Sequence, residues 1–300
     1  MLRFVYYYLR SMRLYYGFVT GTTTLFGALV SGRTLAEGRT WLLFAMGFLA
    51  WGFNQIFSDW CDRREDAVNA PHRPMVTGAL RPMPAFAVSS VGLAAIAIVG
   101  YWLSPYTLLF LGVGGALNIA YSILKRVPVL NCLVYACAIS CCALFGWVGA
   151  TGSLPPSSFC GALAFWVVPV HFLMCHNSYY KDVVGDREAG VRTLQTLCPK
   201  AAMALTVALM VLFPVAVWCV AVGQGRAGVP WLAFGLLVGL LSVLFLIALK
   251  TGQYHRATSL NCQLCVALLH ARSFSQSWPV CLISLMVVNL IFCWYRDEKE

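Results

Sequence analysis

The feature that most constrains this chain is a series of apolar runs, each close to the length of a membrane crossing. No long polar segment separates them along the 300 residues. A helix needs about 20 apolar residues to cross the hydrocarbon core of a bilayer. The sequence therefore predicts an all-α integral membrane protein, a bundle of about nine transmembrane helices in a single membrane domain over residues 1–300. The predicted spans are residues 14–31, 41–60, 84–103, 105–124, 129–150, 160–180, 201–222, 229–249 and 277–295.

The composition agrees with a membrane protein and excludes an ordinary soluble globule. The chain is 60% hydrophobic and only 11% charged, with a mean hydropathy of +0.75, which leaves too little polar surface for a soluble protein. Two segments fit a span less well. Residues 1–13 are basic and aromatic, and we expect them at the membrane interface. Residues 252–275 are moderately apolar, and we expect them either to lie along the interface or to re-enter the bundle.

The basic residues lie at the ends of the apolar runs, which accounts for a formal net charge of +10. This distribution favours membrane lipid or a bound anion as a partner, and no nucleic acid. If the N-terminus is cytoplasmic, only five of the 21 Lys and Arg residues fall on the opposite side: Arg33, Arg39, Arg226, Arg296 and Lys299. The positive-inside rule therefore predicts a multi-pass protein with an odd number of spans and a cytoplasmic N-terminus.

Most of the acidic residues gather in two places, at the exits of the second and sixth predicted spans. Seven of the eleven are found there: Asp59, Asp62, Glu65 and Asp66, then Asp182, Asp186 and Glu188. Both places are predicted on the cytoplasmic side, four spans apart, which indicates a weak internal repeat. Each half of the chain would then bring one carboxylate cluster to a shared cavity mouth.

The spacing within each cluster indicates a metal site. Asp59, Asp62 and Asp66 are spaced i, i+3, i+7 and share one helix face, while Asp182 and Asp186 are spaced i, i+4. Converging carboxylates repel one another unless cations neutralise them, and hard oxygen ligands favour Mg²⁺. Basic residues on the same predicted side add a phosphate ligand to this chemistry; they are Arg73, Lys125, Arg126, Lys181 and Arg192. A diphosphate head with a hydrocarbon tail suits such a site, so isoprenyl diphosphates are the expected substrate class.

Other interpretations use the same residues. One aspartate at the end of a span is ordinarily a solvated helix end, and topology alone explains Lys125 and Arg126. A cation or solute transporter also carries acidic residues in its helices, although usually near the membrane midplane. A phosphotransferase that acts on activated lipid alcohols is a third possibility, but the DG and AR pairs of its signature do not precede the aspartates.

The motifs resemble those of the UbiA superfamily of intramembrane prenyltransferases. Residues 58–78, SDWCDRREDAVNAPHRPMVTG, resemble its first signature, NDxxDxxxD followed by Pro, Arg-Pro and Gly, with Ser58 in place of the usual asparagine. Residues 179–194 resemble the second signature, KDxxGDxxxGxxTL. The YSxxKR ending of the fourth predicted span, at 121–126, is a third similarity. These matches extend over the architecture of nearly the whole chain.

The resemblance implies a Mg²⁺-dependent transfer of a prenyl group to a lipophilic acceptor, with an aromatic acceptor as first choice. Asp59, Asp62 and Asp66 would hold one Mg²⁺, and Asp182 with Asp186 another, as the catalytic residues. The expected substrate-binding residues are Asn54, Ser58, Arg73, Tyr121, Lys125, Arg126, Tyr179, Lys181 and Arg192. The alternative within the superfamily is a membrane terpene cyclase, in which an internal alkene of the substrate captures the allylic cation without any acceptor.

Overall fold

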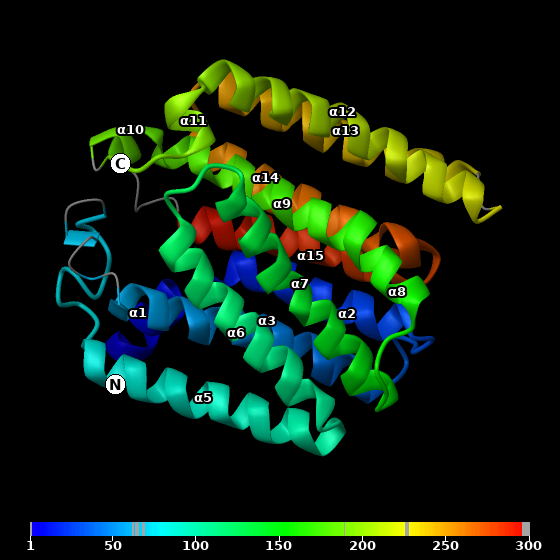
Figure 1. The fold of residues 1–300 in the computed structure, drawn as a ribbon, viewed down its shortest axis with the longest axis horizontal. Coiled ribbons are helices and arrows are strands. Elements are labelled where there is room, and N and C mark those ends of the chain that lie inside the picture. The colour runs from blue at the N-terminus through cyan, green and yellow to red at the C-terminus, as the bar shows by residue number, and fades with distance from the viewer. Residues whose placement is uncertain are drawn as a thin grey trace. The chain divides into compact units, whose positions relative to one another are not determined.

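The protein is described by a computed structural model that covers residues 2–61, 63, 66–67, 70–188, 190–225 and 228–295. These residues form helices joined by turns, and no strand occurs among them (Figure 1). The N-terminal helices are α1 (Leu2–Ser11), α2 (Leu14–Val30), α3 (Gly38–Cys61), α5 (Pro82–Leu103), α6 (Tyr106–Leu124) and α7 (Leu130–Thr151). The later ones are α8 (Ser157–Ala162), η1 (Leu163–Val167), α9 (Val168–Ser178), η2 (Tyr179–Asp182), α10 (Val183–Glu188), α11 (Leu194–Leu197), α12 (Pro199–Gly223), α13 (Val229–Lys250), α14 (Tyr254–His270), η3 (Ala271–Ser273) and α15 (Phe274–Trp294).

The predicted fold class is confirmed, because each of the nine predicted spans lies on a helix. In the part of the chain that the structure describes, eight helical segments have the length and hydropathy of a membrane crossing, and α2 is a shorter apolar helix. Large apolar side chains such as Trp102, Ile123 and Phe165 have more than three quarters of their surface exposed. Side chains of this kind are stable on the outside of a bundle when lipid surrounds it.

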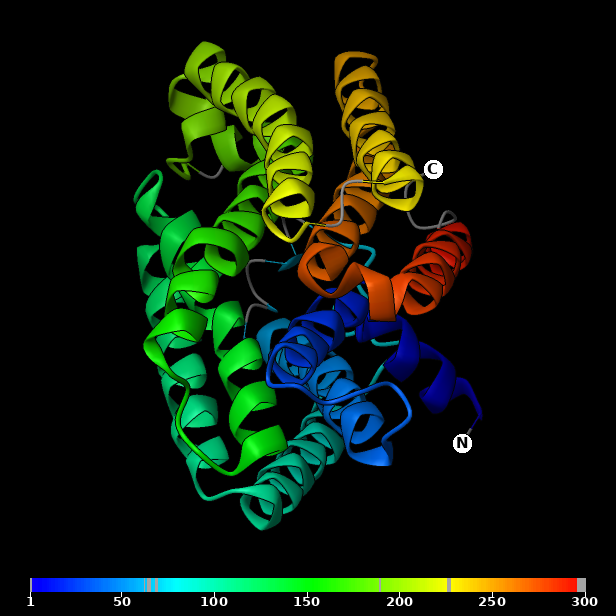
Figure 2. The ribbon, with the colours of Figure 1, turned by 90° about the vertical axis from the view of Figure 1, so that its right-hand side faces the viewer.

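The ambiguous stretch at 252–275 is a buried helix, so its interfacial interpretation is wrong. Every residue from Ala257 to His270 in α14 is buried. Its polar side chains find partners inside the protein, since Asn261 donates to the Met174 carbonyl oxygen at 3.0 Å and Gln263 to Asn289 Oδ1 at 3.0 Å. Figure 2 shows the chain change direction between α14 (orange) and α15 (red), through the 3₁₀ turn η3.

The expected odd number of crossings is also wrong. The hydroxyl of Tyr295, just after α15, donates to the backbone oxygens of Leu9 and Arg10, just before α2. The chain therefore enters the first span and leaves the last one at the same membrane face, which requires an even number of crossings between them. The buried helix α14 supplies the additional crossing.

Two compact units can be distinguished within the chain. Unit 1 consists of residues 1–111, 142–155 and 290–300, and unit 2 of residues 112–141 and 156–289. Three of the four boundaries between the units fall inside helices, in α6, α7 and α15, and the fourth lies between α7 and α8. The single membrane domain and the internal repeat stay predictions.

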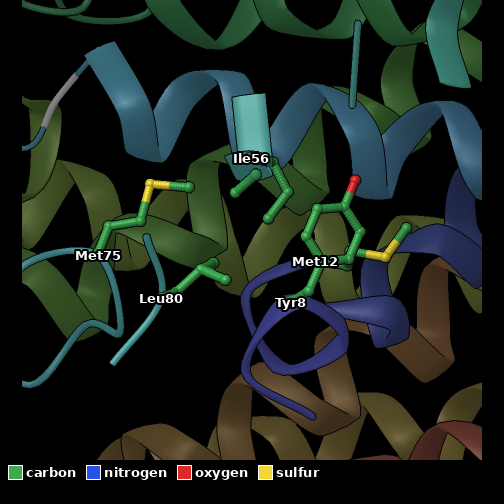
Figure 3. Close-up of a cluster of buried hydrophobic side chains, with 6 residues drawn as sticks. Tyr8, Met12, Ile56, Met75 and Leu80 are labelled. Carbon is green, nitrogen blue, oxygen red and sulfur yellow. The ribbon is translucent and has the colours of Figure 1, made fainter. Parts of the chain in front are cut away.

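In unit 1, α2 packs along α3, and α3 packs against α5. Glycines let helices approach closely, because a Cβ atom at Gly27 would overlap the backbone oxygen of Ala143, and one at Gly146 would overlap that of Thr24. Small residues commonly mediate such close packing in membranes. A separate hydrophobic cluster joins α1, α3 and the turns before α5 through Tyr8, Met12, Ile56, Met75 and Leu80 (Figure 3).

In unit 2, α14 packs against both α9 and α13, and α12 packs against α13. The helix that leads to α9 contains a π-helical turn, η1, followed at once by Pro169. A proline inside a helix has no N–H and crowds the preceding turn, and a π turn relieves that conflict. From this turn Trp166 Nε1 donates to the Leu268 carbonyl oxygen at 2.8 Å, which fixes the helix against α14.

Candidate active site

Asp59 lies in the last turn of α3 and is only 2% exposed. Its Oδ1 atom accepts hydrogen bonds from Arg13 Nη2 at 3.1 Å and from Gln55 Nε2 at 3.0 Å. Arg73 Nη1 lies 3.5 Å from the same oxygen. Gln55 precedes Asp59 by one helical turn, so α3 itself supplies one of these donors. Three donors therefore hold Oδ1, whereas among the described residues Oδ2 has only a 3.5 Å contact with Arg13.

Arg73 joins Asp59 to the second described carboxylate of the first motif. Its Nη1 atom forms an ion pair with Asp66 Oδ2 as well as contacting Asp59. The structure thus brings Asp59, Asp66 and Arg73 together in unit 1, and their roles stay predictions. Burial raises the pKa of Asp66 above its ordinary value, although the neighbouring Arg73 acts in the opposite direction. Asp62, the middle aspartate of the motif, lies outside the described residues.

Arg13 is a member of this cluster that the sequence did not indicate. It stands between α1 and α2 with φ 46° and ψ 57°, in the left-handed region, which is uncommon for a residue with a side chain. Burial acts to lower the pKa of Arg13, but the carboxylates of Asp59 and Asp66 help to raise it above the ordinary value. The guanidinium therefore stays charged. Because 46 residues separate Arg13 from Asp59, no local motif connects them.

Ser58, the residue before Asp59 on α3, forms a hydrogen bond within the helix. The hydroxyl of Ser58 donates to the backbone oxygen of Asn54 at 3.3 Å. This bond is the usual local alternative for a serine in a helix. The substrate-binding roles of Asn54 and Ser58 stay predictions.

The second motif lies in unit 2, where η2 and α10 carry its aspartates. Asp182 pairs with the neighbouring Lys181 at 3.7 Å, and both side chains are partly exposed. Asp186 lies within electrostatic reach of Asp182, Lys125 and Lys181. Its Oδ2 atom is shielded from solvent, yet no hydrogen-bond donor reaches it from the described residues. A shielded carboxylate oxygen in this condition is suited to bind a cation.

Aromatic and thiol side chains lie beneath the second motif. The hydroxyls of Tyr121 and Tyr179 are 3.0 Å apart. Tyr179 is buried in a small cluster with Cys132 and Cys175. The structure thus brings two of the predicted substrate-binding residues together. The other two cations of the prediction, Arg126 and Arg192, are exposed.

A buried polar network, which the sequence did not indicate, joins the helices on either side of the second motif. Gln195 Nε2 donates to the His176 carbonyl oxygen at 2.7 Å and lies 3.1 Å from His176 Nδ1. The other ring nitrogen of His176 lies 3.1 Å from Thr206 Oγ1 on α12. These contacts tie the segment after α10 to α9 and α12. The sequence gives no sign of them, because the histidine has no spacing typical of a functional motif.

The donor set fits Mg²⁺, although the described residues do not by themselves complete a metal site. No group of three His, Cys, Asp or Glu side chains comes together among them. Each motif nevertheless presents two described carboxylates, Asp59 with Asp66 and Asp182 with Asp186. Mg²⁺ is commonly held by one or two carboxylates, together with water and phosphate oxygens.

A helical membrane bundle with two aspartate motifs at helix ends defines the class of protein. Within the chain, residues 20–269 match the model of the UbiA prenyltransferase family. The chain belongs to this family, as the motifs predict.

Two relatives illustrate the sequence similarity. Digeranylgeranylglyceryl phosphate synthase of Natronomonas pharaonis is 30% identical over 179 residues, which is 58% of this chain and 62% of that protein. The bacteriochlorophyll synthase 33 kDa chain of Cereibacter sphaeroides is 28% identical over 210 residues, 63% of this chain and 66% of that protein. The chain thus spans slightly less than two thirds of the length of either relative.

Solved structures show the same fold. An apo UbiA homolog from Aeropyrum pernix K1 has a TM-score of 0.71 at 19% identity, over 87% of this chain and 98% of the other. A UbiA homolog from Archaeoglobus fulgidus, bound to GPP and Mg²⁺, has a TM-score of 0.58 at 15% identity, over 88% of this chain and 99% of the other.

Proposed function

We propose that the protein is a Mg²⁺-dependent prenyltransferase that ionises an isoprenyl diphosphate and transfers the prenyl group to a lipophilic acceptor. The observation that carries this proposal is the pairing of carboxylates with cations at the ends of apolar helices. Asp59, Asp66 and Arg73 form such a group in unit 1, and Asp186 with Lys125 and Lys181 forms another in unit 2. Membership of the UbiA prenyltransferase family supports it, as does the GPP and Mg²⁺ bound by the Archaeoglobus homolog.

In this proposal the carboxylates hold Mg²⁺ and the cations hold the diphosphate. Asp59, Asp62 and Asp66 would bind one ion, and Asp182 with Asp186 the other. When bound, Mg²⁺ neutralises charge that develops on the departing diphosphate. Arg73 already contacts two carboxylates of the first motif, so it is placed to bind a diphosphate oxygen beside them. We assign the same role to Lys125, Arg126, Lys181 and Arg192.

The tyrosines beneath the second motif would face the allylic cation that ionisation produces. An aromatic face stabilises a nearby cation without donating a nucleophile. Tyr121 and Tyr179 hold each other by their hydroxyls, so their rings have little freedom to rotate away. A rigid aromatic wall also excludes water, which would otherwise capture the cation.

The acceptor is proposed only as a lipophilic nucleophile, with an aromatic ring as first choice. The names of the two relatives refer to a glyceryl phosphate and to bacteriochlorophyll, which are different acceptor classes. The exposed apolar sides of the helices would let such a molecule enter from the membrane. Cyclisation of the donor is the second candidate, since it needs the same aspartates.

We propose that the N-terminus and the mouth of the active site face the cytoplasm. The strong asymmetry of Lys and Arg supports this orientation. Reporter fusions at the loops after α3 and α5 test it, because alkaline phosphatase is active only outside the cytoplasm. We expect phosphatase activity from the fusion after α5 and none from the fusion after α3. The reverse result would overturn the proposed orientation.

The function is tested by incubating the purified protein with Mg²⁺ and a panel of prenyl diphosphates, with and without acceptors. Diphosphate release and mass spectra of organic extracts are measured together. Release that depends on the acceptor, with a prenylated product, is expected of a transferase. A cyclic terpene formed at full rate from donor alone would establish the cyclase instead. Failure to release diphosphate from any donor would overturn both.

A further inference from the structure

The C-terminal end of α1 is capped by a side chain from the opposite end of the sequence. The hydroxyl of Tyr295 lies 2.7 Å from the backbone oxygen of Arg10 and 3.1 Å from that of Leu9. Carbonyls in the last turn of a helix have no partner within the helix and need one from outside. Tyr295 is 3% exposed, so this hydrogen bond is protected from water.

Aromatic packing fixes the position of that hydroxyl. The Tyr295 ring contacts the Tyr15 ring edge to face, with centroids 5.3 Å apart. Phe292, one turn earlier in α15, contacts Tyr15 in a tilted arrangement with centroids 4.2 Å apart. Trp294 contacts Tyr6 on α1 at 5.8 Å. The end of α15 is therefore held against α1 and the start of α2 by contacts among five rings as well as by the hydrogen bond.

The cap explains how the chain can turn at Arg13. In a continuing helix the Arg13 N–H would donate to the Leu9 carbonyl, but it donates to Arg10 at 3.4 Å instead. The Tyr295 hydroxyl occupies the place that the Arg13 N–H leaves at Leu9. Arg13 is thereby free to adopt its left-handed conformation, and its guanidinium reaches Asp59 Oδ1.

We infer that Tyr295 is a positioning residue for the first aspartate motif: by capping α1 it fixes Arg13, and Arg13 holds the Asp59 carboxylate in the position from which it would bind a metal ion. The inference rests on the proposed function, since it assigns Asp59 as a metal ligand. Both α1 and α15 lie outside residues 20–269, the range that matches the family.

The test measures metal binding without turnover. Mn²⁺ serves as the probe for Mg²⁺, with inorganic diphosphate present, and its binding to the purified full chain is followed by electron paramagnetic resonance. Tyr295→Phe removes the hydroxyl while keeping the ring and every charge. Changes to groups that orient a metal ligand typically weaken binding about 10- to 100-fold. Because Tyr295 acts through Arg13, we expect the lower end, about tenfold. Tyr101→Phe, at an exposed tyrosine, is the control and should leave the affinity unchanged.

Arg13→Lys tests the contact between Arg13 and Asp59 directly, since it preserves the charge but loses the planar guanidinium. It should weaken Mn²⁺ binding similarly, and adding Tyr295→Phe to it should have no further effect. A lower melting temperature in Tyr295→Phe with unchanged Mn²⁺ affinity would show a merely structural cap and overturn the inference. Unchanged affinity in Arg13→Lys would overturn it even if Tyr295→Phe did not fold. Absence of Mn²⁺ binding by the wild-type protein would overturn the proposed function itself, which separates the two failures.

Discussion

Arg73 and Asp66, seven residues apart in the first motif, form an ion pair, and the same Arg73 nitrogen also contacts Asp59. One guanidinium thus balances two buried carboxylates. Neither carboxylate can move toward a ligand without changing the contacts of the other, so Arg73 couples them.

Neutralising this residue should impair both donor binding and stability. In Arg73→Gln, two carboxylates lose a counter-ion and the diphosphate loses a donor, so we expect KM for the prenyl diphosphate to rise about tenfold or more. The lost charge-assisted contacts should cost about 1–3 kcal/mol of unfolding free energy. Steady-state kinetics and thermal unfolding in detergent check these effects. Arg81→Gln, at an exposed residue in the same segment, should change neither, and equal effects of both variants would contradict the prediction.

The aspartates of the second motif should be essential for turnover and dispensable for folding. Asp182→Asn and Asp186→Asn keep the shape of each side chain and remove its charge, so we expect kcat to fall about 100-fold or more. Melting temperature and elution volume should stay near those of the wild type. Glu188→Gln, in the same helix as Asp186 but at a variable position of the motif, is the matched control. Near-normal turnover in Asp186→Asn would rule out a metal-binding role for this residue.

Burial of Asp66 should make stability depend on pH in a defined direction. Its pKa is raised in the folded state, so the folded protein retains a proton that the unfolded chain has already lost. The stabilisation is complete below the ordinary carboxyl pKa and is lost as pH rises through the raised value. Without Mg²⁺, the melting temperature of Asp66→Asn minus that of the wild type should therefore increase with pH. A difference that decreases as pH rises would contradict the raised pKa.

The role of Tyr179 can be separated into its ring and its hydroxyl. Tyr179→Phe keeps the aromatic face, and we expect kcat to change less than about threefold. Tyr179→Leu removes that face, and loss of a cation–π contact should lower kcat by about tenfold. Product analysis should show more water-derived prenyl alcohol in the leucine variant. Equal kcat values for the two variants would assign the residue to packing alone.

Close helix packing at Gly27 gives a prediction about stability alone. A methyl group there would overlap the Ala143 backbone, so Gly27→Ala should destabilise the protein by about 1–3 kcal/mol. A Cβ at Gly112 on α6 would meet nothing within 4 Å, which makes Gly112→Ala the control. Thermal unfolding should separate the two variants, and equal melting temperatures would show that α2 and α7 can move apart at little cost.

Hydropathy predicts most of this fold because a span is a local property of about 20 residues. It fails at α14, whose Asn261 and Gln263 are polar in sequence but satisfied in the structure by Asn177, Met174 and Asn289. A pattern of single residues cannot show that their partners lie on other helices. Because the prediction lacks this span, it gives an odd number of membrane crossings where the structure requires an even number.

The aspartates and Arg73 could be predicted because motif spacing places them on one helix face or in the turn that follows. Arg13 could not, since its role depends on a left-handed turn and on contacts with Asp59, 46 residues away. The network around His176 was missed for the same reason, as its partner Thr206 lies 30 residues further along.

The contact between Tyr295 and Arg10 has a practical consequence for handling the protein. An affinity tag joined directly after Tyr295 would begin beside Arg13 and the first aspartate motif, not across the bilayer from them. A bulky or charged fusion there would press on the cap of α1, and thus on the residue that holds Asp59. Tags and topology reporters are therefore better placed in the loop between α12 and α13, where they leave this junction intact.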